Sequence, residues 1–346
     1  IYWAGGNPFH HHQDLNRLIK GWRRPSTVIV NEPWWTPTAQ WADIVFPATT
    51  ALEREDICAS SHDPYAHVMQ AALPAQHQAR SDHEIFAGLA KRLNVEAAFT
   101  EGRSQRQWLQ DMWQRSSELA LREGFKLPEF EDFWHTGTFQ IPEVAPRPVW
   151  LADFRANPVL HPLKTPSGKI ELFSKTIAEF NYGDCPGHAA WLEPFERLGG
   201  AGHSRYPLHL LTPQPERRLH SQLDHSAHSQ AGKIQGKEVI RIHPATAAAR
   251  GLCQGDLVRV FNDRGACLAA VGLDMNRLVD VVSLPTGSWF ALLDDATDAN
   301  GNPNVLTADI GTSNLAQGPS ANTCLVEIEK YLGTTDPSNP AAISTP

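Results

Sequence analysis

Two glycines and an asparagine follow the first apolar segment of the chain and could hold a ligand. Residues 1–3 are predicted to form a buried strand, and Gly5, Gly6 and Asn7 come directly after it. Glycines allow the backbone to approach a bound group closely, and an asparagine amide can hydrogen-bond a base or a phosphate. The segment lacks the G-x-G-x-x-G spacing of a dinucleotide fingerprint, so a plain tight turn is the alternative.

An acidic side chain stands at the end of the second predicted strand. Residues 27–30 are typical of a strand, and Asn31 and Glu32 follow them. In a parallel sheet that binds a dinucleotide, an acid at this position accepts hydrogen bonds from a ribose or a guanine edge. The alternative is an acid that is simply solvated in a loop.

Three consecutive histidines, His10, His11 and His12, invite a metal site. Consecutive side chains project in different directions from a helix or a strand, so the three rings cannot all face one ion. We therefore predict polar contacts at the surface or at the edge of a cofactor, with His11 as the candidate, and no metal ligand in this chain.

Composition excludes several classes of protein. The 346 residues carry 30 Lys and Arg against 38 Asp and Glu, a formal net charge of -8, which disfavours nucleic acid and anionic lipid as partners. No apolar run approaches the roughly 18 residues that span a bilayer, so no membrane insertion is predicted. The five cysteines are few and far apart, which favours buried structural thiols and a reducing compartment.

The first part of the chain, residues 1–95, alternates strand-like and helix-like segments and predicts an α/β unit with parallel strands. The strands are expected at residues 1–3, 27–30 and 44–46. Helical spacing of apolar residues predicts helices over 14–22 and 82–93, with Asp14 and Ser81 as caps.

The rest of the chain changes character twice. Residues 96–204 contain one predicted helix, 105–122, and then a region rich in proline and tryptophan, which we expect to lie over a larger neighbour with Trp134, Trp150 and Trp191 as anchors. Residues 205–332 predict a β-rich domain, a barrel, with strands at 208–211, 257–261, 268–271 and 281–284 and a helix at 244–250. The tail, 333–346, has the composition of a disordered segment.

Motifs that occur in one order along the chain resemble a known family. They include WTPTA at 35–39, ADIVFPATT at 42–50, ARSDHEIF at 79–86 and RRLHSQL at 217–223, with further matches at 258–265, 304–307 and 312–318. Together they resemble the dimethyl sulfoxide reductase family of bis(molybdopterin guanine dinucleotide) oxidoreductases, especially its S- and N-oxide reductases. The resemblance covers roughly residues 1–331, which makes coincidence very improbable.

The resemblance implies a fold and a set of cofactor-binding residues. It implies a Rossmann-like unit that holds the guanosine end of one pterin cofactor, an irregular connecting region, and a six-stranded double-psi barrel over the second pterin. The family usually has Asp where this chain has Glu32. Carried over by position, the cofactor-binding residues would be Gly5, Gly6, Asn7, Phe9, His11, Glu32 and Asp82 in the first unit, and Arg218, His220, Ser221, Gln222, Asn304, Gln317 and Gly318 in the last.

The resemblance also implies a reaction. In this family molybdenum takes the oxygen atom from an S- or N-oxide, and two electrons with two protons release it as water. No residue of this chain resembles the family's molybdenum ligand, so no catalytic residue and no metal ligand are predicted here. The implied partners are a missing N-terminal part of the same polypeptide, the oxide substrate and an electron donor protein.

Three alternatives remain open from the sequence. Another branch of the same superfamily, such as a formate dehydrogenase or nitrate reductase catalytic subunit, would share the cofactor-binding domains. A non-catalytic carrier of the pterin cofactor would need the same domains alone, and a metal-free barrel enzyme would need an electrophile that nothing in the sequence indicates. The family contains both cytoplasmic and periplasmic enzymes, and the free cysteines favour the cytoplasm.

Overall fold

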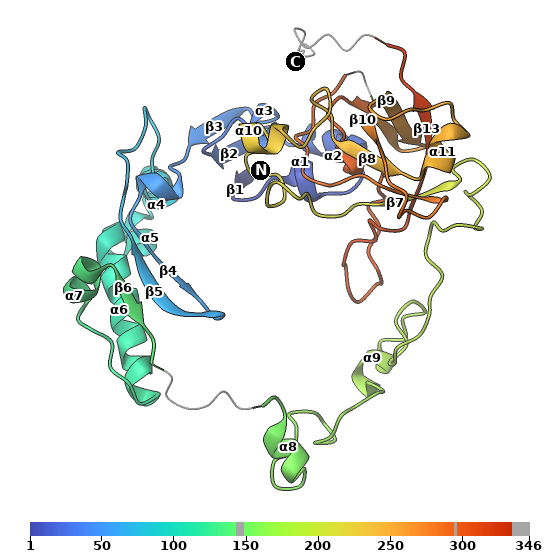
Figure 1. Ribbon diagram of the computed structural model, residues 1–346. Coiled ribbons are helices and arrows are strands. Elements are labelled where there is room, and N and C mark those ends of the chain that lie inside the picture. The colour runs from blue at the N-terminus through green and yellow to red at the C-terminus, as the bar shows by residue number, and fades with distance from the viewer. Residues whose placement is uncertain (143–148, 294–295, 334–346) are drawn as a thin grey trace. The chain divides into compact units, whose positions relative to one another are not determined.

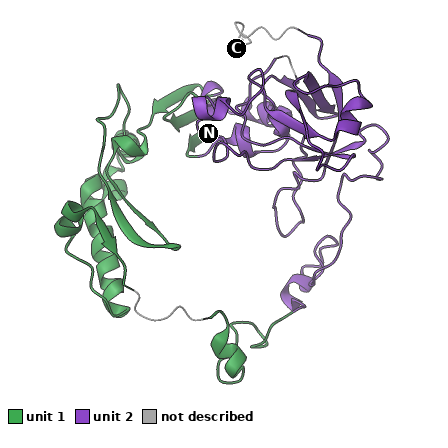
Figure 2. Cartoon of the chain, viewed as in Figure 1, with its two compact units in different colours: residues 1–5, 27–35, 42–171 green, residues 6–26, 36–41, 172–346 purple. Residues whose placement is uncertain are grey.

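The structure is a computed structural model that describes residues 1–142, 149–293 and 296–333. The chain forms two compact units, which Figure 2 colours separately. Unit 1 comprises residues 1–5, 27–35 and 42–171, and unit 2 comprises residues 6–26, 36–41 and 172–346. Except for Gly333, the tail for which the sequence predicts disorder lies outside the described residues.

A small parallel sheet opens unit 1 (Figure 1). Its strands are β1 (Tyr2–Ala4), β2 (Ile29–Glu32) and β3 (Ile44–Pro47), with β2 in the middle. The Asp43 carboxylate accepts a hydrogen bond from the Val28 N–H at 2.7 Å, which ties the entries of β2 and β3 together. The predicted parallel strands are confirmed with small shifts at their ends, while the finer Rossmann-like assignment stays a prediction.

The two longest helices of unit 1 begin where side chains cap them. Helix α4 (Asp82–Arg92) has a capping box, in which Ser81 and Glu84 each bond the other's backbone N–H. Helix α6 (Gln105–Arg122) is capped in the same way by Ser104 and Gln107, so both helices predicted from apolar spacing in this region are confirmed. The shorter helices are η1 (Ala51–Glu53), α5 (Glu96–Thr100), α7 (Phe130–Thr136) and α8 (Ala152–Ala156).

A second sheet of unit 1 was not expected from the sequence. Strands β4 (Asp56–Ser60), β5 (Asp63–Met69) and β6 (Thr138–Gln140) pair antiparallel. Because β6 pairs with β5, segments on both sides of residue 95 share one sheet; the domain boundary placed there stays a prediction. One face of β4 and β5 carries Ile57, Ala66 and Val68 and packs on the core of the unit, while most residues of the other face are exposed.

Aromatic packing gives unit 1 a core. Trp113 of α6 stacks on Phe133 of α7 with ring centroids 3.8 Å apart, and Ala66 of β5 belongs to the same buried cluster. Trp134 is only 8% exposed and stacks on Phe130, so its expected role as an anchor for a neighbour is wrong. The Trp134 ring is therefore packed against residues of unit 1.

Unit 2 is built around a closed β-barrel. Strands β7 to β11 and β13 pair in the order β10, β8, β11, β7, β13, β9, and β9 pairs again with β10 to close the ring. The predicted barrel is confirmed, and its double-psi connection stays a prediction. The strands are β7 (Leu208–Leu211), β8 (Val239–Ile242), β9 (Leu257–Asn262), β10 (Gly265–Leu273), β11 (Val281–Ser283) and β13 (Cys324–Lys330), with β12 (Thr297–Asp298) beside β10.

The barrel core follows from alternation along its strands. In β9, Val258 and Val260 are fully buried while their neighbours are partly exposed, the pattern of a strand with one inward face. Strand β10 is buried along almost its whole length because β9, β8 and β12 all pair with it. Short helices connect the strands: α9 (Lys175–Glu179), α10 (Ala227–Gln230), α11 (Pro244–Ala248) and η2 (Pro303–Val305).

Three short helices from the first 41 residues belong to unit 2. They are α1 (Pro8–His11), α2 (Leu15–Trp22) and α3 (Pro37–Gln40). Asp14 caps α2 as predicted, accepting a hydrogen bond from the Arg17 N–H. Phe9 of α1 is fully buried, with aromatic rings packed around it that stabilise the position of α1 on the barrel: Trp22, Trp41 and Phe290.

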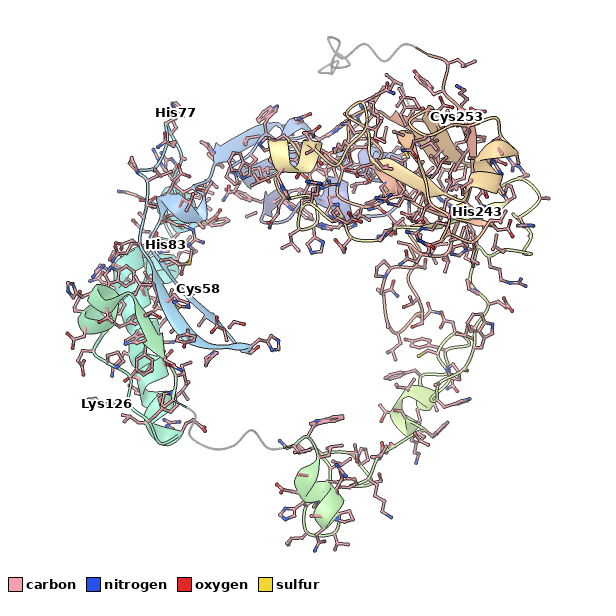
Figure 3. All side chains as sticks on the ribbon, in the orientation of Figure 1. Cys58, His77, His83, Lys126, His243 and Cys253 are labelled. Carbon is pink, nitrogen blue, oxygen red and sulfur yellow. The ribbon has the colours of Figure 1, made fainter. Side chains whose placement is uncertain are left out.

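The cysteines differ from expectation. Cys267 and Cys324 are buried, as predicted, but Cys58 and Cys253 are exposed, so the expectation of buried thiols is wrong for these two (Figure 3). Cys58 lies on the polar strand β4, and Cys253 lies in the turn between α11 and β9. Within the described residues, no helix is both long enough and apolar enough to cross a membrane.

We expect a thiol reagent to modify Cys58 and Cys253 quickly and Cys267 and Cys324 only after unfolding. The thiolate is the reactive form, and burial raises the pKa of Cys324 to about 12 and that of Cys267 well above its ordinary value. Mass spectrometry of labelled peptides measures each site. Rapid labelling of Cys324 in folded protein would contradict this prediction.

Candidate functional site

The loop that carries the RLHSQL motif has an unusual backbone. His220 and Leu223 both adopt left-handed conformations, with φ of 51° and 50°. Gly287, at φ 93°, lies so close that a methyl group on it would overlap the His220 carbonyl and come within 3.1 Å of Arg218 Nε. The loop can adopt this conformation because residue 287, which lies against the His220 carbonyl, is a glycine.

Helix α1 meets this loop through polar side chains. Asn7, the residue before α1, donates from Nδ2 to Ser221 Oγ at 3.3 Å, and its Oδ1 accepts from Thr38 Oγ1 at 2.5 Å. The rings of His10 and His220 lie 5.8 Å apart between centroids. Residues more than 200 positions apart in the sequence thus form one polar cluster within unit 2.

Two buried asparagines of the segment after β12 hold the backbone of α1. Asn302 donates to the Phe9 carbonyl at 3.0 Å, and Asn304 donates to the His10 carbonyl at 2.5 Å. Thr307 in turn donates to Asn304 Oδ1 at 2.7 Å. Asn304, a predicted cofactor residue, therefore has its amide engaged with α1 and orients the histidines.

Four charged side chains lie buried beneath the loop, and we call them the ion cluster: Arg218, Asp224, Lys233 and Glu238. Each has a side chain 3% to 7% exposed. Arg218 contacts Asp224 at 3.3 Å and Glu238 at 2.7 Å, and Lys233 contacts Asp224 at 2.8 Å and Glu238 at 3.5 Å. Burial raises the pKa of Glu238, and both cations oppose that rise. Two cations and two anions make the cluster neutral.

Burial keeps His10 neutral. Burial, together with the nearby His11, His220 and Arg218, lowers the pKa of His10 to about 4. Burial lowers the pKa of His11 as well. At neutral pH His10 and His11 are therefore uncharged, and they can donate and accept hydrogen bonds without repelling the adjacent Arg218.

We expect the contribution of His10 to the free energy of unfolding to fall as the pH drops from 6.5 toward 4. The unfolded chain protonates His10 near its ordinary pKa of 6.5, while the folded chain resists protonation until about pH 4. Stability from this residue is thus complete above pH 6.5 and is lost below it, by about 3 kcal/mol at most. Chemical denaturation at several pH values measures it. His10→Gln should flatten this part of the profile, whereas the exposed control His228→Gln should not; equal profiles for both variants would contradict the assignment.

The remaining candidates of unit 2 lie in three places, two at the surface and one in the core. Gln222 is exposed at the end of the left-handed loop. Gln317 and Gly318 belong to a short loop that is closed by its own hydrogen bonds: Thr312 donates to the Gly318 carbonyl at 2.9 Å, and Gln317 donates to the Ser313 carbonyl at 2.8 Å. Phe9 lies in the aromatic core described above, away from solvent. Cofactor contacts by these four residues stay predictions.

Unit 1 carries a separate set of polar residues. Tyr2 donates to Asn31 Oδ1 at 2.8 Å, and Asn31 Nδ2 donates to Asp82 Oδ1 at 2.9 Å. Asp82 is exposed on the first turn of α4, and Glu32 is half-buried at the end of β2, where it accepts from the Trp34 N–H at 3.4 Å. The predicted acids thus stand at the carboxyl end of β2 and at the start of α4. Gly5 and Gly6 adopt φ of 82° and 78°, which explains the glycine pair.

The side chains of unit 2 fit a pterin cofactor. A pterin presents amide-like edges and phosphates, and the available groups are hydroxyl, amide and imidazole, which bind such edges without reacting. The buried side-chain atoms that lack a hydrogen-bond partner within the described residues include two at this site, His10 Nδ1 and Arg218 Nε. Buried polar atoms are rarely left unpaired, so these two favour a polar ligand beside the cluster.

Comparison with known protein families identifies the family of the chain. Residues 1–92 match the family described as molybdopterin oxidoreductase, and residues 208–325 match the molydopterin dinucleotide binding domain. The chain belongs to the molybdopterin oxidoreductase family. This assignment agrees with the resemblance that the motifs indicate.

Curated members of the molybdopterin oxidoreductases are similar over 96% of this chain. A biotin sulfoxide reductase from Cereibacter sphaeroides is 46% identical, and a trimethylamine-N-oxide reductase from Haemophilus influenzae is 44% identical. The chain spans 45% and 42% of their lengths, so less than half of each relative is represented. Acetylene hydratase from Pelobacter acetylenicus superposes with a TM-score of 0.70 at 20% identity, over 95% of this chain and 44% of that one, and shows the shared fold.

Sequence reasoning missed several residues of the site. Asp224, Lys233 and Glu238 form contacts that orient the predicted residues but lie outside the quoted motifs, and Thr38, which lies inside the WTPTA motif, was given no role. Asn31 was noticed beside Glu32, but its bond to Asp82 required the fold. Buried charge cannot be read from a sequence, because lysine and glutamate are ordinarily exposed.

Proposed function

We propose that this chain is the cofactor-binding portion of a bis(molybdopterin guanine dinucleotide) enzyme that reduces S- or N-oxides. The observation that supports it most is the 46% identity to a biotin sulfoxide reductase across 96% of the chain. Other relatives are named trimethylamine-N-oxide and dimethyl sulfoxide reductases. The substrates proposed are accordingly biotin sulfoxide, trimethylamine N-oxide and dimethyl sulfoxide.

The residues of unit 2 would hold one pterin. His220, Ser221 and Gln222 bind its polar edges from the left-handed loop, and Asn7 and His11 bind from the segment around α1. Gln317 and Gly318 complete the pocket with backbone and amide groups. Hydroxyl, amide and imidazole groups suit this task because they hydrogen-bond the cofactor without reacting with it.

The residues of unit 1 would hold the guanosine end of the other pterin dinucleotide. Asp82 accepts the amino protons of the guanine with the oxygen that Asn31 leaves available, and Glu32 accepts from the ribose. The positive φ of Gly5 lets the backbone of unit 1 approach the phosphates, and Gly6, the first residue of unit 2, also has a positive φ.

When bound, the molybdenum of the cofactor supplies the oxygen-atom and electron transfer. This chain binds, orients and shields the cofactor, and the metal ligand is supplied by the further polypeptide that the relatives contain. An electron donor protein completes the reaction. The five cysteines are free, which supports the cytoplasm as the compartment.

Native mass spectrometry of the intact protein, purified without oxygen, tests the proposal. We expect two pterin dinucleotides and one molybdenum per protein, together with reduction of the three oxides by a reduced viologen dye. Cofactor without oxide reduction would favour a pterin carrier or another branch of the superfamily. Protein that contains neither pterin nor molybdenum would overturn the proposal.

A further inference from the structure

The ion cluster of Arg218, Asp224, Lys233 and Glu238 does more than fill space. Four charges removed from water carry a large desolvation penalty, and apolar residues of similar size often stabilise a protein as well or better. A cluster of this kind is therefore weak as a source of stability. It can instead fix geometry, because each charge must meet its partner in one arrangement.

Every member of the cluster connects to the loop at residues 218–224. Arg218 and Asp224 are the first and last residues of that loop, so the cluster clamps both of its ends. Arg218 also donates to the Thr286 carbonyl at 3.0 Å, beside Gly287. The left-handed residues His220 and Leu223 lie between the two clamped ends.

Lys233 stands at the centre of these contacts. Its ammonium group donates to Asp224 Oδ2 at 2.9 Å and to Ser288 Oγ at 3.3 Å, and it lies 3.5 Å from Glu238. Asp224 Oδ2 also accepts from the Trp289 N–H at 3.0 Å, and the Trp289 indole donates to the Ser221 carbonyl at 2.7 Å. A chain of bonds thus runs from Lys233 through Asp224 and Trp289 to Ser221.

We propose that Lys233 is a positioning residue that, through Asp224 and Trp289, holds His220 and Ser221 in the orientation that binds the pterin. This inference rests on the proposed function. The side chain of Lys233 is only 3% exposed and is surrounded by Asp224, Glu238 and Ser288. Its effect reaches the cofactor only through the loop, as outer residues orient the ligands of a metal site.

The test compares cofactor release in the intact, loaded protein. Lys233→Met removes the charge and keeps the length, and Lys233→Arg keeps the charge. The matched control is Arg250→Gln, which breaks another partly buried ion pair of unit 2, the contact of Arg250 with Glu327 at 2.6 Å and 3.2 Å. All proteins are incubated below their unfolding midpoints, and pterin that remains bound is measured over time.

We expect Lys233→Met to release pterin about 10- to 100-fold faster than the parent, the range seen when outer orienting residues are removed. Lys233→Arg should restore slow release, and Arg250→Gln should lower the unfolding midpoint without faster release. Equal release by Lys233→Met and Arg250→Gln would overturn the inference. If the parent protein holds no pterin, the proposed function is wrong, and this result differs from the one that would overturn the inference about Lys233.

A second readout needs no cofactor. Hydrogen exchange at the amides of residues 219–223 should be at least about tenfold faster in Lys233→Met than in the parent, and unchanged in Arg250→Gln. Unchanged exchange in Lys233→Met would overturn the inference. If Lys233→Met does not fold, Asp224→Asn replaces it, since this change keeps the side-chain shape and weakens the same contact.

Discussion

Replacing Gly287 by alanine should unfold the left-handed loop and release the cofactor from unit 2. The added methyl group would overlap the His220 carbonyl oxygen, lie 2.8 Å from its carbon and lie 3.1 Å from Arg218 Nε. Backbone atoms cannot move aside as a flexible side chain can, so the loop must shift. We expect the free energy of unfolding to fall by about 3 kcal/mol or more, the range for overpacking combined with backbone strain. Denaturant unfolding and bound pterin content measure the two effects.

Gly255→Ala is the matched control for Gly287→Ala. Gly255 has φ 84°, close to the 93° of Gly287, but no atom lies within 4 Å of an added methyl group. The control therefore carries the backbone strain alone, about 1 kcal/mol, and should keep its pterin. Equal losses in the two variants would show that crowding against His220 has no role.

Replacing Asp298 by asparagine should destabilise the barrel and loosen helix α1. Asp298 is fully buried, and its carboxylate accepts four backbone N–H groups, from Ala291, Asn300, Gly301 and Asn302, at 2.7 Å to 3.0 Å. An amide nitrogen in place of Oδ2 would face three of these donors without accepting from them. We expect a loss of about 4 kcal/mol, since each buried donor left unpaired costs about 1 to 3 kcal/mol.

The effect of Asp298→Asn should extend to the polar cluster formed by Asn7, His10, His220 and Ser221. Asn302 holds the Phe9 carbonyl and Asn304 holds the His10 carbonyl, so disorder after residue 298 would free α1. Calorimetry and hydrogen exchange at residues 8–11 measure both effects. The exposed residue Asp280 provides the same substitution as a control, and Asp280→Asn should change stability by less than about 0.5 kcal/mol. If the amides of α1 remain as protected from hydrogen exchange in Asp298→Asn as in the parent, the proposed connection between Asp298 and α1 is wrong.

The pKa of Asp298 predicts in which direction its contribution to stability changes with pH. Burial raises its pKa to about 6, against the opposing effect of its four backbone hydrogen bonds. A folded pKa above the ordinary 3.8 means that the contribution of this group falls as the pH rises through about 4 to 6. This trend is opposite to that of His10, so Asp298→Asn and His10→Gln should alter the pH profile in opposite directions.

Local patterns in the sequence predicted the long helices and four of the six barrel strands, but not β8 and β13. Helices α2, α4 and α6 begin at side chains that bond the first free N–H groups, a signal contained in a few consecutive residues. Strand β9 and its turn into β10 follow from alternation and from the Asn-Asp-Arg-Gly segment. Such features depend on neighbours along the chain, so a sequence displays them.

Features that depend on distant residues were missed. Strand β5 pairs with β6 some 70 residues later, and its one buried residue, Ala66, joins a core built by α6 and α7 from further along the chain. Trp134 was expected at an interface because tryptophan is common there, yet it packs on Phe130 in the core. Only the fold could show which partner covers it.

The sequence by itself determined the family, the parallel strands, the barrel and the segments that carry Asn7, Asp82, His220 and Ser221. Tertiary structure alone decided that Asn7 bonds Ser221, that Gly287 shapes the loop, and that Lys233 is buried. A motif is a set of residue types in a fixed order along the chain, so it can be recognised from the sequence alone. Burial and contact depend on chain segments brought together from opposite ends, and the energy of a charge depends on whether water reaches it.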